Sequence, residues 1–214
     1  MDVLNFLAET HCLNHQVHRV KPDTVTVESH AEQQLRYIRQ TMTRASTYTM
    51  VPGWGGVWMG FIAITASVVA TWAEDDRFWL AIWFGAAVLA VTVGVFTVAR
   101  KAKKAQTPIF TGPGLRFWMC LSTAVAVGLL LTVALYERGL FDLMPGVWML
   151  LFGMGVTTGG VFSVRLVPVI GVGFLITGGI ALFLPLNWGN VLMAISFGGF
   201  DIVAGYLIAR NYGG

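Results

Sequence analysis

Six long apolar stretches between Trp54 and Ala209 constrain the fold of this chain more than any other feature. Only 12% of the 214 residues are charged, against about 25% in a typical soluble domain, so most of the chain needs no contact with water. A helix of about 20 apolar residues crosses a hydrocarbon core and satisfies its own backbone hydrogen bonds there. The sequence therefore predicts an all-α polytopic membrane protein with six transmembrane helices.

These stretches also sort the charged residues onto two sides. The predicted spans are Trp54–Trp72, Phe78–Ala99, Leu115–Tyr136, Gly146–Val164, Val167–Leu186 and Gly189–Ala209. Twelve of the fourteen Lys and Arg residues then fall on one side. Because these residues collect in cytoplasmic loops, both termini are predicted to be cytoplasmic and the protein to lie in the plasma (inner) membrane. The predicted inner-leaflet basic residues are Arg36, Arg39, Arg44, Arg100, Lys101, Lys103, Lys104, Arg165 and Arg210.

The second, fourth and sixth spans end in similar strings. A glycine, a short apolar run and an arginine recur at Gly94–Arg100, Gly160–Arg165 and Gly205–Arg210. This recurrence predicts three helical hairpins, 54–100, 115–165 and 167–210, related as parallel repeats about an axis along the membrane normal. The alternative is that small residues and terminal arginines are simply common at inner span ends.

Twenty-five glycines are many for a chain of this length. Some have the GxxxG spacing, which lets helix backbones approach closely, and others form pairs inside the fifth and sixth spans. Close packing is predicted for them, either within one chain or between chains. The predicted packing glycines are Gly56, Gly60, Gly155, Gly159, Gly178, Gly179, Gly198 and Gly199.

Two resemblances follow from these patterns. Residues 171–208 form a Gly-rich helix, a turn with proline and a second Gly-rich helix, and this segment resembles the hairpin repeat of HdeD-type bacterial membrane proteins. From Arg36 onward the chain is also similar to uncharacterised six-helix bacterial integral membrane proteins, through Arg36–Arg39, Val51–Gly56 and Ile208–Arg210. Both resemblances imply an integral membrane protein, and neither implies a catalytic residue.

Asp201 is the only acidic residue well inside a predicted span. A carboxylate in hydrocarbon is costly and suggests a functional site by default, such as a proton or cation site or a contact with a partner protein. Ser196 and Tyr206, five residues away on either side, are candidates to face it. The structural alternative is a protonated or hydrogen-bonded aspartate that faces the bundle.

A second candidate site lies near the N-terminus. His11, His15 and His18 share one face if the segment is helical, with Cys12 beside them. Imidazole and thiolate ligands suit zinc or copper, so these four residues are a candidate metal site. The alternative is a solvated, poorly ordered arm.

The segment before the first span predicts a further helix. Ser29 and Glu32 have capping-box spacing, and Leu35, Ile38 and Met42 then fall on one face among arginines. Such a basic amphipathic helix lies on the inner leaflet or docks to a cytoplasmic partner. The predicted domains are thus a cytoplasmic arm at 1–28, this helix and a link at 29–50, and the transmembrane domain at 51–214.

No phosphate loop, dinucleotide fingerprint, HExxH or GxSxG motif occurs, so no enzyme activity, cofactor or nucleic-acid partner is expected. The leading hypothesis is a non-enzymatic accessory or structural membrane protein that binds lipid, a second copy or a membrane-protein partner. The second is a small channel or proton-linked transporter that uses Asp201. The third is a metal- or redox-linked sensor that uses the histidine and cysteine cluster.

Overall fold

The computed structural model describes residues 32–37, 53–105, 113–161 and 163–212, and every regular element in these ranges is helical. Contacts divide the chain into two units, Met1–Thr43 and Arg44–Gly214. Of the first unit, Glu32–Tyr37 forms a short helix in which Arg36 pairs with Glu32 at 3.6 Å.

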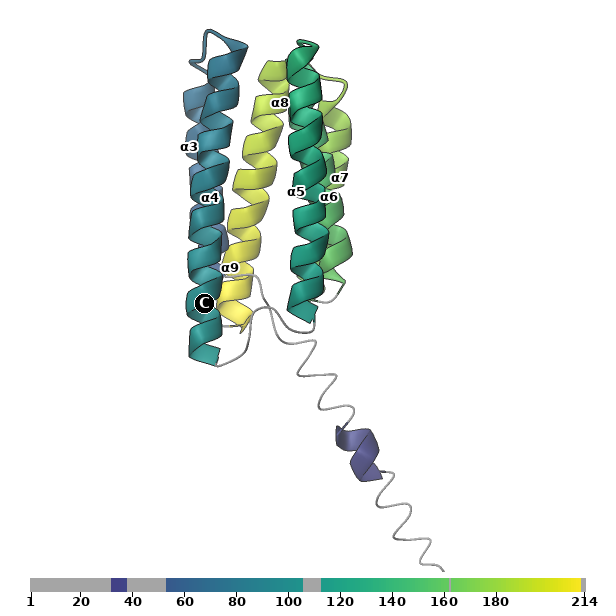
Figure 1. Ribbon diagram of the computed structural model, residues 1–214. Coiled ribbons are helices and arrows are strands. Elements are labelled where there is room, and N and C mark those ends of the chain that lie inside the picture. Colours follow the sequence, from purple (N-terminus) through teal and green to yellow (C-terminus); the bar gives the residue numbers. More distant parts are fainter. Residues whose placement is uncertain (1–31, 38–52, 106–112, 162, 213–214) are drawn as a thin grey trace, which may run out of the picture. The chain divides into compact units, whose positions relative to one another are not determined.

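The second unit is a bundle of helices that run roughly along one axis (Figure 1). Its elements are α3 (Gly53–Ala70), α4 (Asp76–Ala105), α5 (Pro113–Glu137), the 3-10 turn η1 (Phe141–Leu143), α6 (Met144–Gly160), α7 (Leu166–Ala181), α8 (Leu186–Met193), the π-helical turn η2 (Ala194–Phe200) and α9 (Asp201–Tyr212). The elements α8, η2 and α9 follow one another without a break and form one continuous helical segment. The apolar runs of the sequence thus fold as helices that pack side by side.

Five of these helical segments are long and apolar enough to cross a membrane. They are Gly53–Ala70, Asp76–Lys103, Gly114–Glu137, Phe141–Gly160 and Leu186–Asn211. The chain is therefore a multi-pass membrane protein by the length and composition of its helices.

The fifth predicted span is shorter than expected. Helix α7 ends at Ala181 after 16 residues, about 24 Å of rise, and the prediction had carried it to Leu186. Successive short turns follow, with Phe183 N donating to Ile180 O and Leu184 N to Ala181 O. Pro185 explains this ending, because a residue that precedes proline is disfavoured in the α conformation.

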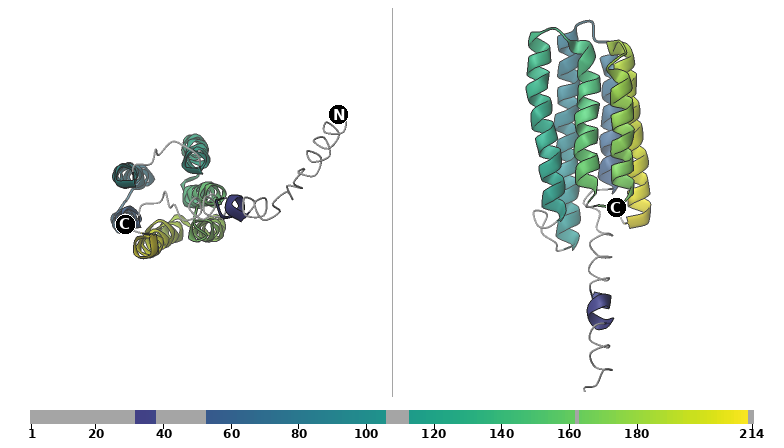
Figure 2. Two further views of the ribbon diagram at one scale, coloured as in Figure 1. Left: turned by 90° about the horizontal axis from the view of Figure 1, so that it is seen from below. Right: turned by 90° about the vertical axis from the view of Figure 1, so that its right-hand side faces the viewer.

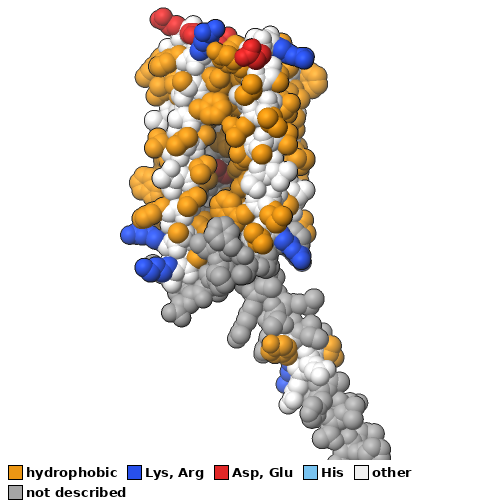
Figure 3. Space-filling model, in the orientation of Figure 1, with side chains coloured by type: hydrophobic (Ala, Val, Ile, Leu, Met, Phe, Trp, Pro, Cys, Tyr) orange, Lys and Arg blue, Asp and Glu red, His pale blue; other side chains and the backbone are white. Residues whose placement is uncertain are grey.

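The two ends of the bundle differ in charge. The acidic turn between α3 and α4 lies at the same end as the connection between α5 and α6, with Arg77 and Arg138 nearby. At the other end Figure 3 shows Lys and Arg side chains and no acidic ones on its visible, described surface. The basic residues of that end include Arg100, Lys103, Arg165 and Arg210.

Close helix contacts depend on glycines from distant parts of the chain. Helix α3 packs on both α4 and α9, and α6 packs on both α5 and α7. A Cβ added to Gly205 of α9 would lie 2.5 Å from the carbonyl oxygen of Gly53 in α3. One added to Gly153 of α6 would lie 2.8 Å from the carbonyl oxygen of Gly171 in α7. These backbones approach too closely for any side chain at those positions.

The core of the bundle is rich in methionine and phenylalanine. Met144, Met149 and Phe174 are fully buried. The Phe174 ring lies 4.9 Å from the Phe152 ring and 4.9 Å from the Phe197 ring, between centroids. These contacts join α6, α7 and η2, and they form the wall behind the candidate site.

Candidate functional site

Helices α4 and α5 are neighbours in the chain but do not pack closely against each other, unlike α3 with α4 or α5 with α6. A cavity of about 260 Å³ lies between them, with α3, α6 and η2 behind it. Figure 3 shows the corresponding recess on the face of the bundle, and the view along the bundle axis in Figure 2 shows how the helices are arranged. Val91, Val125 and Leu129 line the cavity and are also 64%, 49% and 50% exposed, so its mouth opens sideways.

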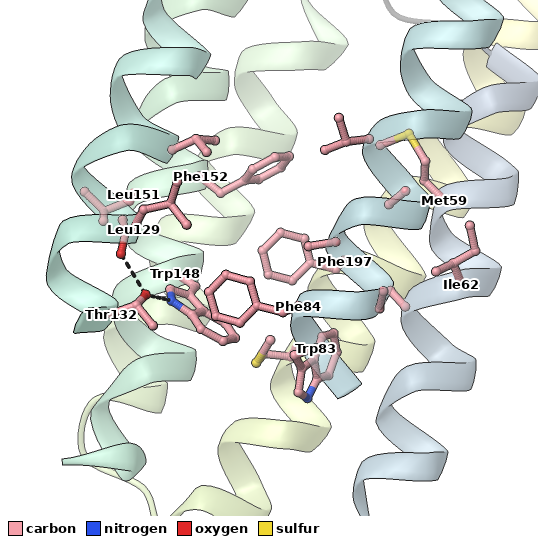
Figure 4. A pocket seen from close by; sticks show the side chains of 18 of the residues that line it. Met59, Ile62, Trp83, Phe84, Leu129, Thr132, Trp148, Leu151, Phe152 and Phe197 are labelled. Atoms are coloured by element: carbon pink, nitrogen blue, oxygen red, sulfur yellow. Dashed lines mark hydrogen bonds between the residues drawn. The ribbon is translucent and has the colours of Figure 1, made fainter. Parts of the chain in front are cut away.

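The wall of the cavity is aromatic and aliphatic. Figure 4 shows rings from both sides of the gap directed toward the same space. Along α4 the lining runs from Trp83 to Val91, about 12 Å of helix rise. The aromatic lining residues are Trp83, Phe84, Trp148, Phe152 and Phe197.

Stacked rings close one end of the cavity. The Trp148 ring of α6 stacks on Trp79 of α4 with centroids 5.7 Å apart and planes 10° from parallel. Phe84 meets the same indole edge-on at 6.0 Å. The Trp148 N–H donates to Thr132 Oγ1 of α5 at 2.8 Å, as drawn in Figure 4. Three helices therefore meet at this end, nearer the acidic turn, although α4 and α5 separate beyond it.

A buried hydrogen-bond network holds the α4 wall in place. The Trp83 indole N–H donates to Asn190 Oδ1 of α8 at 3.1 Å. The Asn190 amide donates to the Ser67 carbonyl oxygen of α3 at 3.0 Å, and the Ser67 hydroxyl donates back to the Asn190 carbonyl oxygen at 3.2 Å. Asn190 and Ser67 are 4% and 7% exposed. Because every partner is buried and bonded, the network fixes the Trp83 ring against the cavity.

Among the described residues of the cavity lining, Asp201 is the only ionisable one. It begins α9 directly after the π-helical turn η2, roughly midway along the Leu186–Asn211 span. Within the described part of the chain, its carboxyl makes no hydrogen bond or ion pair. An acidic side chain is visible inside the recess in Figure 3. π-helical turns are rare and frequently occur at functional sites.

The two proposed neighbours of Asp201 have other environments. Ser196 is fully buried, and its hydroxyl lies 2.7 Å from Thr177 Oγ1 of α7. Tyr206 is 50% exposed on the outside of α9. Neither is part of the cavity lining, so the expectation that they face Asp201 there is wrong. Tyr206 follows Asp201 by five residues along α9, and an α-helix does not bring that spacing to one face.

The predicted packing glycines divide into two groups. A Cβ added to six of them would lie within 3.3 Å of a neighbouring helix: Gly56, Gly60, Gly155, Gly159, Gly178 and Gly198. Gly56 also allows the Asp201 carbonyl oxygen to approach α3, at 3.3 Å from the added Cβ. Gly179 and Gly199 have nothing within 4 Å, so the expected close packing at these two is wrong within the chain.

None of the other candidate residues that the structure describes lines the cavity. His11, Cys12, His15, His18, Arg39 and Arg44 lie outside the described residues. Arg100, Lys101, Lys103 and Lys104 belong to the last turns of α4, Arg165 precedes α7 and Arg210 ends α9. Within the described ranges, no group of three His, Cys, Asp or Glu residues is arranged to hold a metal ion.

Sequence reasoning identified Asp201 but missed the rest of this site. Trp83 and Trp148 lie near the ends of predicted spans, where tryptophans usually anchor a helix at the membrane interface. Trp83 is instead 5% exposed, inside the bundle. The one available signal was Asn190, an amide within an apolar span that requires buried partners.

Comparisons with protein-family models, curated proteins and solved structures show no significant match to this chain.

Proposed function

We propose that this protein is a non-enzymatic integral membrane protein that binds a small apolar molecule from the bilayer in the α4–α5 cavity. The single observation that carries this proposal is the sideways opening between two neighbouring helices that do not pack together. A packed bundle without a ligand role would be expected to close such a gap, since buried apolar contact is favourable.

The size of the cavity favours a small molecule over a partner helix. Ligand pockets are usually about 300–1,000 Å³, and the cavity, at about 260 Å³, lies just below this range. A partner helix that lay along the whole gap would have to displace the Trp79–Trp148 stack, which closes one end of the cavity. An accessory role through a partner protein, the leading expectation from the sequence, therefore finds less support in this cavity than ligand binding does.

We further propose six crossings, with α7 as the sixth, arranged as three hairpins in a bacterial inner membrane. Helix α7 is apolar throughout and packs along α6. The basic end of the bundle would face the cytoplasm, together with both termini, because Lys and Arg collect there. The differing charges of the two ends in Figure 3 support this orientation.

A binding experiment that compares wild type with a variant whose cavity is filled by a larger side chain tests the proposed function. The probe is tritiated neopentylbenzene, a small neutral aromatic hydrocarbon, measured by scintillation proximity on the full-length protein in mild detergent. Ala90→Trp places an indole on the lining, and Leu89→Trp places one on the neighbouring residue, which is 59% exposed and outside the lining. Saturable binding is expected for wild type and Leu89→Trp and is expected to be lost in Ala90→Trp. Equal uptake by all three proteins would contradict the proposal.

Proton-linked transport is the second candidate function. It is favoured by the position of Asp201, at mid-span, in the cavity and next to a π-helical turn. Ionisable groups inside membrane spans commonly take part in proton and ion pathways. In proteoliposomes, transport of a cavity ligand should then depend on a pH gradient and be lost in Asp201→Asn. Ligand binding without any gradient-dependent flux would leave only the binding function.

A further inference from the structure

Resting on the proposed binding function, we infer that the ligand of the α4–α5 cavity is a small lipophilic organic cation, held by the Asp201 carboxylate and by the aromatic rings of the lining. This goes beyond the presence of a binding site, because it specifies the charge and the chemical class of the occupant.

The first observation is the unpaired carboxyl. Asp201 lines the cavity and has no hydrogen-bond or ion-pair partner among the described residues. An ionised side chain in a membrane span is costly to insert, and such residues are normally paired. Among the residues that the structure describes, no basic side chain lines the cavity. A cation from outside the protein would supply the missing partner.

The second observation is that the other polar groups of the lining are already used. The Trp83 N–H donates to Asn190 and the Trp148 N–H donates to Thr132. The Thr132 hydroxyl donates to the Gly128 carbonyl oxygen at 2.7 Å. An anion, or a ligand that needs hydrogen-bond donors, would therefore find none on these side chains. The Asp201 carboxyl is the one polar group left to select a ligand.

The third observation is the density of rings around the space. Trp83, Phe84, Trp148 and Phe197 all contribute to the lining, and Figure 4 shows them converging from both sides of the gap. Ring faces attract cations that have lost water, and recognition of quaternary ammonium groups by such rings is well established. The apolar remainder of the wall suits the hydrocarbon part of the ligand.

A matched pair of ligands tests the inference. Benzyltrimethylammonium and neopentylbenzene have nearly the same shape and differ by one charged nitrogen in place of carbon. Competition against tritiated ligand on full-length wild-type protein is expected to show tighter binding of the cation to the protein site. Asp201→Asn should weaken cation binding about tenfold or more, corresponding to about 1.4 kcal/mol. Asp76→Asn makes the same chemical change at the acidic end, outside the lining, and should leave both affinities unchanged.

The outcomes separate this inference from the proposed function. If the neutral isostere binds as tightly as the cation, or if Asp201→Asn leaves cation binding unchanged, the inference is overturned while the binding function stands. If neither ligand shows saturable binding that Ala90→Trp removes, the binding function fails as well. The comparison of the two ligands on wild-type protein needs no variant, so a folding defect in Asp201→Asn does not affect it.

Discussion

The indole N–H of Trp83 in α4 donates a hydrogen bond to Asn190 Oδ1 in α8 at 3.1 Å, and the two residues are 107 positions apart in the chain. Asn190 also bonds to α3 through Ser67, so one buried amide joins three helices.

Asn190→Ala should therefore destabilise the bundle. It leaves the buried Trp83 N–H without a partner, and it removes one of the two hydrogen bonds that the Ser67 carbonyl oxygen accepts, the other being from the Thr71 N–H at 3.2 Å. An unsatisfied buried group costs about 1–3 kcal/mol. Interhelical hydrogen bonds in membranes have smaller measured values, near 0.6 and up to about 1.7 kcal/mol, so we expect a loss of about 1–2 kcal/mol in the free energy of unfolding. Reversible unfolding in mixed detergent micelles measures this loss. Asn187→Ala, on the exposed side of α8, should be neutral, and equal effects of the two changes would contradict the role of the network.

Gly205→Ala should force α3 and α9 apart. The added Cβ would lie 2.5 Å from Gly53 O and 2.6 Å from Val57 N, and both are backbone atoms that cannot rotate away. Overpacking of this kind costs about 1–3 kcal/mol. Gly179→Ala meets nothing within 4 Å, and alanine favours a helix over glycine by about 1 kcal/mol. Thermal unfolding should show a lower midpoint for the first variant and an equal or higher midpoint for the second.

The helices were predictable from the sequence because a long apolar run has few alternatives in a bilayer. Most of the predicted bounds fall within a few residues of the observed ones. The end of α7 was predicted too late, because Pro185 was placed in a turn but its effect on the residues before it was not considered. A proline disfavours the α conformation in the residue that precedes it. The apolar runs therefore sufficed to predict the helices, except at the end of α7, where Pro185 follows.

The packing partners were not predictable in the same way. Gly53 and Gly205 contact each other across α3 and α9, and they lie at opposite ends of the transmembrane sequence. No local pattern pairs them. The cavity was missed for a related reason, because it exists where α4 and α5 fail to meet, and a sequence read along the chain does not reveal a missing contact. Asp201 was found because its cost in an apolar span is local.

The Asp142 side chain of η1 caps the first turn of α8. Asp142 Oδ1 accepts a hydrogen bond from the backbone N–H of Leu186, the first residue of α8, at 3.0 Å. Pro185 at the N-cap position makes no side-chain cap. Asp142→Ala should then cost about 1 kcal/mol, a typical value for a lost cap. Asp142→Asn keeps the acceptor oxygen and should cost a few tenths at most. Reversible unfolding distinguishes the two, and an equal loss would assign the effect to charge alone.

Labelling of single cysteines tests the proposed orientation. Glu74 lies in the exposed acidic turn, and Lys103 is exposed at the basic end. In a chain with Cys12 and Cys120 replaced by serine, Glu74→Cys should react with a membrane-impermeant maleimide in intact cells. Lys103→Cys should react only after the cells are permeabilised, because basic segments stay in the cytoplasm. The reverse pattern would invert the topology, and labelling of both in intact cells would contradict a single orientation.

Cation binding in the cavity should weaken as the pH falls. Benzyltrimethylammonium keeps its charge at every pH, whereas the Asp201 carboxylate takes up a proton and loses its attraction for the ligand. The helices packed against η2 and α9 are α3, α6, α7 and α8, and none carries an ionisable side chain. On α9 itself the other ionisable residues are Tyr206, Arg210 and Tyr212, and the first two are exposed.

The sign of the effect follows from linkage. A ligand that binds only the ionised form loses up to about tenfold in affinity for each unit of pH below the point at which the carboxyl becomes protonated. Equilibrium binding from alkaline to acidic pH should therefore show a steady loss for wild type and a flat profile for Asp201→Asn. Binding of neopentylbenzene should not weaken with acid, because a neutral ligand gains nothing from the carboxylate. A pH-dependent loss that persists in Asp201→Asn would assign the titration to another group and remove Asp201 from the recognition of the cation.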